Sequence, residues 1–98
     1  MTAKLKITHG SGNVFRDIGF SEAESENLKI RSTLMSRVEK FVCDTGLTQS
    51  EAAKVLGVTQ PRLNQLLKGK IQLFSVDALV NMLASAGMRV TVTVKRAA

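Results

Sequence analysis

The sequence has little of the chemistry that enzymes use. It contains one cysteine, Cys43, and one histidine, His9. A single cysteine cannot form an internal disulfide, which agrees with a reducing compartment. Because Cys43 ends the apolar stretch "KFVC", we expect a small core residue there and not a nucleophile. His9 has no set of metal ligands around it, and neither a Walker loop nor a nucleophile elbow occurs along the chain. The sequence therefore predicts no catalytic site, no metal and no cofactor, which disfavours an enzyme.

Long apolar runs are also missing. Hydrophobic residues make up 44% of the 98 residues, but they are spread periodically and never reach membrane-spanning length. The first ten residues, "MTAKLKITHG", lack the apolar core of a secretory signal, so we expect a cytoplasmic protein without a membrane partner. Positive charge is what the chain has in excess, with 14 Lys and Arg against 8 Asp and Glu and a formal net charge of +6. This excess favours an anionic partner, although a merely soluble basic protein has the same composition.

The chain is short enough for a single domain with an extension in front of it. Residues 1–20 are expected to form a partly flexible N-terminal extension, because Gly, Ser and Asn gather in its middle. Within it, "KLKIT" alternates basic and apolar residues, which allows a short strand with Leu5 and Ile7 on one face. Residues 21–98 form the expected domain.

Capping signals predict four helices in that domain. Each helix begins after a Ser or Thr whose side chain accepts a hydrogen bond from the first turn, and each ends at a glycine that tolerates left-handed backbone. A bend or break between residues 27 and 32 of the first helix is compatible with its sequence. The predicted boundaries are Ser21 to Gly46, Thr48 to Gly57, Thr59 to Gly69, and Ser75 to Gly87.

The second and third helices are joined by a very short connection within "LTQSEAAKVLGVTQPRLNQLLKGK". Pro61 falls in the first turn of the third helix, where its missing N–H would have no intrahelical partner. Gly57 permits a positive φ in the turn, and Ala53 is small enough to let the two helix backbones approach closely. These intervals predict a helix-turn-helix, in which one helix lies across the DNA backbone and the next enters the major groove.

One strong strand pattern follows the last helix. In "MRVTVTVKR", residues 88–95 alternate apolar with polar side chains, which predicts a half-buried strand. A lone strand is not stable, so it must pair with residues 4–8 or with its own copy in a second subunit. The second option gives a symmetric homodimer, with an interface that uses Val90, Val92 and Val94 together with parts of the fourth helix.

Five residues of the helix-turn-helix stand at the positions that define the motif in the Xre/Cro–phage repressor family, which the chain resembles. The resemblance implies a mainly α fold, a four- to five-helix phage-repressor-like domain with a C-terminal β-strand. Three longer stretches resemble a subgroup of stand-alone regulators that are similar to HigA-type antitoxins. The resemblance therefore implies a transcriptional repressor that acts on its own promoter; the alternative is an antitoxin that also binds and neutralises a RelE/HigB-like toxin. The five residues are Gln49, Ala53, Gly57, Leu63 and Leu66.

The candidate DNA contacts lie on and around the third helix, residues 59–68. Gln60, at its start, should reach deepest into the major groove, where a glutamine amide can pair with adenine. Gln49 begins the preceding helix and suits a phosphate, and a two-fold dimer would match a palindromic operator. Two other interpretations remain: ordinary solvated polar residues, or an interaction module that never contacts DNA. The full predicted set is Gln49, Thr59, Gln60, Pro61, Arg62, Asn64, Gln65, Lys68 and Lys70.

Overall fold

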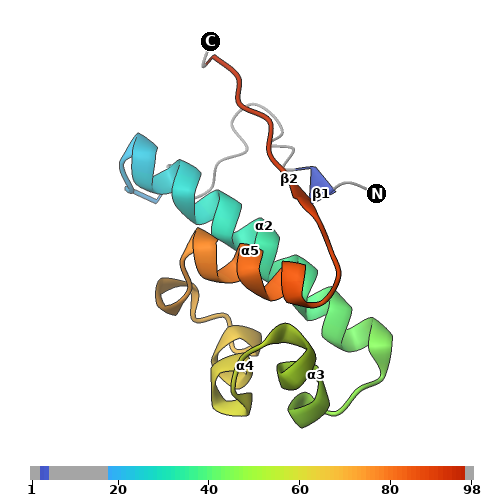
Figure 1. Ribbon diagram of the computed structural model, residues 1–98. Helices are drawn as coiled ribbons and strands as arrows, with labels where there is room; N and C mark the ends of the chain where they lie inside the picture. The colour runs from blue at the N-terminus through green and yellow to red at the C-terminus, as the bar shows by residue number, and fades with distance from the viewer. Residues whose placement is uncertain (1–2, 5–17, 97–98) are drawn as a thin grey trace.

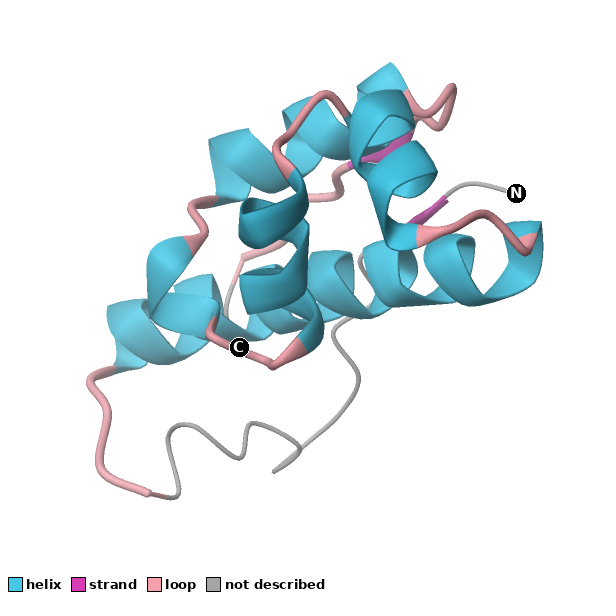
Figure 2. Ribbon diagram, turned by 90° about the horizontal axis from the view of Figure 1, so that it is seen from below, coloured by secondary structure: helices cyan, strands magenta, loops and turns pink. Residues whose placement is uncertain are grey.

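A computed structural model describes residues 3–4 and 18–96 of the chain. The described residues form four α-helices, one 3₁₀ turn and two short strands (Figure 1). Helices account for most of this part of the chain, as Figure 2 shows in cyan, and the two magenta strands are small. The mainly α prediction with four helices is thus confirmed. The elements are β1 Ala3–Lys4, α2 Glu22–Thr45, α3 Gln49–Leu56, α4 Gln60–Leu67, η2 Ile71–Leu73, α5 Val76–Ser85 and β2 Val90–Thr91.

The four helices begin at the predicted N-caps, whereas α4 and α5 have Lys68 and Ala86 as C-caps, one residue before the predicted glycines. Ser21 Oγ accepts a hydrogen bond from the Glu24 N–H at 3.1 Å, and the Glu24 carboxylate accepts one from the Ser21 N–H at 3.2 Å. This reciprocal capping box satisfies two backbone donors that have no intrahelical partner. Thr48 and Glu51 form a second box of the same kind at the start of α3. The helix α2 runs without interruption through residues 27–32, so the bend that the sequence allowed there does not occur.

The hydrophobic core lies between the long helix α2, the helix α5 and the α3–α4 pair. In Figure 1, α5 lies along α2, and α3 and α4 pack below them at one end. Leucine predominates at the fully buried positions, and each such side chain contributes roughly 1.5–3 kcal/mol through removal from water. The largest fully buried side chains are Leu34, Val38, Leu56, Leu63, Leu66, Phe74, Leu79 and Leu83.

Cys43 does not belong to this core. Its side chain is exposed, so the prediction of a small core residue is wrong. Along α2, Val38 is buried and both Phe41 and Val42 are partly buried against the core. A helix turns by about 100° per residue, and the step from Val42 to Cys43 carries the side chain beyond the edge of the buried stripe. The apolar residues next to Cys43 in the sequence therefore do not predict its burial.

The C-terminal strand is shorter than predicted and pairs within the chain. β1 and β2 are parallel, with Ala3 opposite Val90 and Lys4 opposite Thr91. The strand prediction over 88–95 is therefore wrong in length, and Val92 and Val94 are 61% and 88% exposed. Among the described residues, β2 ends at Thr91, before either valine.

Some sequence predictions concern other parts of the chain. The expected strand residues Leu5 and Ile7, and the expected flexibility of the extension up to residue 17, lie outside the described residues. None of the described helices combines the length and the apolar character that a membrane span needs.

Candidate nucleic-acid interface

The connection between α3 and α4 is held in one geometry by backbone hydrogen bonds. Gly57 adopts φ +75°, and its N–H donates to the Lys54 carbonyl at 3.2 Å. The next N–H, of Val58, donates to the Ala53 carbonyl at 2.9 Å. These bonds satisfy carbonyls of the last turn of α3, and a left-handed glycine at this position is the usual way for a helix to end. The turn therefore fixes the angle between the two helices.

The helix α5 supports the turn from behind. Ser85 Oγ donates a hydrogen bond to the Val55 carbonyl at 2.9 Å, which joins α5 to the last turn of α3. A Cβ atom on Gly57 would lie only 3.2 Å from the same Oγ. Ala53 is 2% exposed and lies within the core, as its small size led us to expect. Close approach of α3, the turn and α5 thus leaves room only for small residues.

The helix α4 presents one face to the core and another to solvent. Leu63 and Leu66 are fully buried. At about 100° per residue, Pro61 and Lys68, the C-cap residue, fall on the opposite side, whereas Gln60 lies at the edge of the leucine face; all three are exposed. Asn64 and Gln65 are partly buried. The solvent side of α4 therefore carries amide groups and one ammonium group, which are the groups that read base edges and phosphates.

The start of α3 is a second polar feature. Gln49 is the first residue of this helix, and its side chain is exposed. The Glu51 carboxylate nearby accepts a hydrogen bond from the Thr48 N–H at 2.9 Å. That backbone bond, and then the bond between the Glu51 and Thr48 side chains, lower the pKa of Glu51. The ionised carboxylate opposes a second anion at this helix end, whereas the neighbouring Gln49 amide is neutral.

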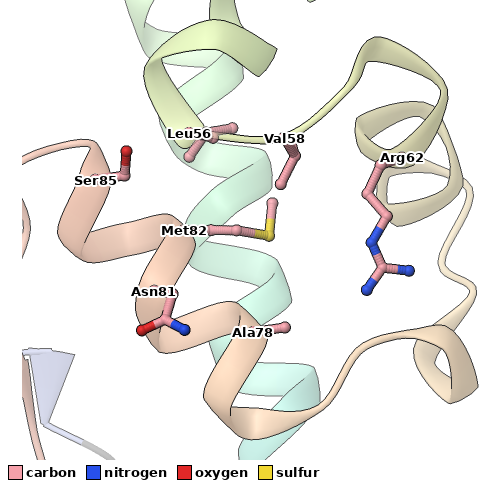
Figure 3. A pocket seen from close by; sticks show the side chains of 8 residues that line it. Leu56, Val58, Arg62, Ala78, Asn81, Met82 and Ser85 are labelled. Atoms are coloured by element: carbon pink, nitrogen blue, oxygen red, sulfur yellow. The ribbon is translucent and has the colours of Figure 1, made fainter.

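Arg62, one of the predicted DNA contacts, packs against an aromatic ring of its own chain. Its guanidinium carbon is 4.1 Å from the centroid of the Phe74 ring, an arrangement in which cation and aromatic face attract each other. The side chain is partly buried and extends from α4 toward the chain that leads to α5 (Figure 3). Arg62 is therefore set apart from the exposed side of α4 that carries Gln60 and Lys68.

The loop after α4 is anchored by a residue that the sequence did not reveal. Arg31 of α2 donates through Nη1 to the carbonyl of Ile71 at 3.2 Å and to that of Phe74 at 3.4 Å. Its Nε donates to Asn27 Oδ1 at 2.7 Å, which orients the guanidinium. No local pattern could have shown this contact, because Arg31 and its loop partners are 40 or more positions apart. Lys68 and Lys70 precede this anchored loop and are both exposed.

The predicted dimer residues lie apart from the predicted DNA contacts. Val90 is partly buried, and Val92 and Val94 are exposed. In Figure 1 the strands lie above the α2–α5 pair, whereas α3 and α4 lie below it. A dimer built on the strand would therefore leave the surface of α3 and α4 free.

Among the residues that the structure describes, no group of three or more His, Cys, Asp or Glu side chains could hold a metal ion.

Comparison with known proteins adds to this geometry. A family model described as a helix-turn-helix domain matches residues 14–95, which is most of the chain. No curated protein matches the sequence significantly. The matched region includes the fixed turn, the buried leucines of α4 and its polar exposed face. The chain belongs to this family of helix-turn-helix domains, whose motif is a DNA-binding one.

Proposed function

We propose that this protein is a sequence-specific transcriptional regulator, a repressor of its own promoter, that reads the major groove with α4. The observation that carries the proposal is the division of α4 between buried leucines and an exposed polar face. The turn at Gly57 holds that face at a fixed angle to α3. A rigid angle is what a helix pair needs when one member crosses the DNA backbone and the other enters the groove.

The exposed residues have distinct roles in this proposal. Gln60, at the start of α4, contacts adenine through its amide, and Lys68 contacts guanine or a phosphate. Of Asn64 and Gln65, one contacts a base and the other contacts a phosphate. Gln49 and Lys70 contact phosphates on either side of α4, and such contacts set the position of the protein on the duplex without reading sequence. Thr59 and Pro61 approach the groove because they flank Gln60.

A homodimer on a palindromic operator completes the proposal. One recognition helix reads only a few base pairs, and a two-fold dimer doubles the contact surface. Within the described chain, β2 pairs on one edge only, and the exposed Val92 and Val94 follow it directly. The free edge of β2 and these valines supply an apolar strand that its own copy can pair with across a two-fold axis.

The test is fluorescence anisotropy with the DNA directly upstream of the protein's coding region, against scrambled DNA, at two salt concentrations. A repressor of its own promoter should prefer the upstream DNA by roughly a thousandfold or more. Gln60→Ala should weaken binding to that DNA by about 1–3 kcal/mol and leave scrambled-DNA binding unchanged. Lys70→Ala is the matched phosphate variant, and it should weaken both complexes alike. Equal, steeply salt-dependent affinity for both DNAs, unaffected by Gln60→Ala, would refute the proposal.

A second candidate function is that of an antitoxin that keeps the same DNA-binding activity. Apolar surface beyond the needs of the helix-turn-helix favours it, because Ile18 and Phe20, before α2, are 67% and 41% exposed. A toxin would cover this segment and the first turns of α2. Co-purification with a small basic ribonuclease-like protein encoded by the neighbouring reading frame would support this function. An Ile18→Asp variant that still retains such a partner fully would count against the assigned surface.

A further inference from the structure

A pocket of about 370 Å³, open to solvent on one side, lies beside the recognition helix (Figure 3). It is bounded by the turn that joins α3 to α4, by Arg62 of α4, and by one face of α5. Cavities that hold small molecules in proteins begin at about this size, near 300 Å³. The side chains that matter for its chemistry are Leu56, Val58, Arg62, Asn81, Met82 and Ser85.

The cavity is apolar at its base and polar at its margin. Leu56 and Met82 are almost completely buried, at 1% and 3% exposure, and they belong to the hydrophobic core. Asn81 and Ser85 are exposed on α5, and Arg62 approaches from the opposite side (Figure 3). Of the polar side chains labelled in Figure 3, Arg62 lies across from Met82 and Ala78, whereas Asn81 and Ser85 point away from Arg62. This arrangement suits a ligand with one apolar part and one charged part.

Arg62, Asn81 and Ser85 have donor or acceptor groups that form no hydrogen bond within the described part of the chain. Arg62 uses only the face of its guanidinium, stacked on Phe74, so the N–H groups at its edge stay available. Within the described part of the chain, neither these N–H groups nor the Asn81 amide donates to a protein acceptor, and Arg62 has no carboxylate partner. Ser85 Oγ donates to Val55, which leaves its lone pairs free to accept. The unmatched charge at the cavity is therefore positive.

We propose that this cavity is a binding site for a small organic anion, a carboxylate with a compact apolar group. The Arg62 guanidinium pairs with the carboxylate through its edge while Phe74 holds its face, and the apolar group lies on Met82 and Val58. A guanidinium edge matches a carboxylate geometrically, because two parallel N–H···O bonds can form at once. This inference goes beyond the proposed function and needs no DNA.

The test uses methyl-labelled methionine and NMR, with sodium benzoate as the probe. Met82 lines the cavity, whereas Met35 is buried elsewhere in the core and serves as an internal reference. Benzoate should shift the Met82 methyl signal in a saturable way and leave the Met35 signal in place. Benzamide has the same shape without the charge, and it should bind about tenfold or more weakly, since a charged pair is lost.

Two variants distinguish benzoate binding at Arg62 from binding through the overall positive charge of the protein. Arg62→Met should weaken benzoate binding about tenfold or more. Lys68→Met removes one positive charge from the end of the same helix, outside the cavity, and should leave benzoate binding unchanged. If Arg62→Met fails to fold, Ala78→Leu replaces it: Ala78 lines the cavity from α5, and the larger side chain should abolish the Met82 response.

Three outcomes would overturn the proposal. Equal binding of benzoate and benzamide would mean a plain apolar cavity, and equal losses in Arg62→Met and Lys68→Met would mean diffuse charge. A Met82 shift produced by duplex DNA or inorganic phosphate, with none from benzoate, would make the cavity a seat for a DNA phosphate. Because the readout is made on the free protein, a failure of DNA binding would not affect it.

Discussion

At Gly57 two constraints act on one residue. Its φ of +75° lies in the left-handed region, and a Cβ atom there would also meet Ser85 Oγ at 3.2 Å. Gly46, at the end of α2, has a similar φ of +69° but no heavy atom within 4 Å of the position that a Cβ would take. Comparing Gly57 with Gly46 therefore separates the cost of left-handed backbone from the cost of contact with Ser85.

We therefore expect Gly57→Ala to destabilise the protein more than Gly46→Ala does. Left-handed backbone costs an L-residue roughly 1–2 kcal/mol, and both variants should lose about that amount. Gly57→Ala should lose more, because the contact with Ser85 also strains the Val55 hydrogen bond. Urea unfolding monitored by circular dichroism measures both free energies. Equal losses would show that Ser85 moves aside without cost.

At the scale of elements, the connection between α4 and α5 is held by a contact from α2. Arg31 donates to two carbonyls of the loop, Ile71 and Phe74. A partly buried charged donor of this kind contributes about 1.5–3 kcal/mol to stability. By contrast, Lys40 and Asp44 form an exposed ion pair at 2.8 Å on the same helix, and such pairs contribute little.

Arg31→Met should thus lower the unfolding free energy by about 1.5–3 kcal/mol, and Lys40→Met by less than about 0.5 kcal/mol. Methionine keeps most of the side-chain length, so the loss reports the hydrogen bonds. Chemical unfolding of both variants provides the comparison. A loss in Lys40→Met as large as that in Arg31→Met would contradict the anchoring role.

The capping box at the start of α3 makes stability depend on pH. The Thr48 backbone N–H, and then its hydroxyl, hold the pKa of Glu51 below its ordinary value of 4.5. A carboxylate whose pKa is lower in the folded state stabilises the protein above the unfolded-state pKa. That stabilisation is lost as the pH falls through the folded-state pKa.

Glu51→Gln should flatten this dependence. The unfolding free energy of the wild-type protein should fall as the pH drops below about 4.5, and that of the variant should fall less over the same range. Urea titrations at a series of pH values between neutral and acid measure the difference. Parallel curves for the two proteins would mean that Glu51 makes no net contribution.

At the scale of the whole molecule, the proposed dimer depends on the segment after β2. Val92 and Val94 are exposed, and in a strand that continued β2 the Thr93 side chain between them would point to the other side. Val92→Lys should therefore yield a monomer and weaken operator binding about a hundredfold or more, because half of the contacts are lost. Thr93→Lys adds the same charge on the opposite side and should remain dimeric.

Light scattering at micromolar concentration measures the oligomeric state of both variants. A wild-type protein that is monodisperse and monomeric would overturn the dimer, whatever the variants do. Dimers in both variants would show that Val92 is not part of the interface.

The local elements could be predicted from the sequence because their causes are local. A Ser or Thr cap and its hydrogen-bond partner are three positions apart, and a terminating glycine acts on its own backbone. The four helices and the tight turn at Gly57 follow from such signals, and so does the division of α4 into a leucine face and a polar face.

Tertiary structure decided what depends on residues far apart in the chain. It placed Arg62 on Phe74, tied the loop after α4 to Arg31, and opened the cavity between the turn and α5. It also left Cys43 exposed and limited β2 to two residues, because burial and strand pairing depend on which surfaces meet. Neighbours in space that are 12 or more positions apart leave no periodic trace in the sequence, and only the packed fold reveals them.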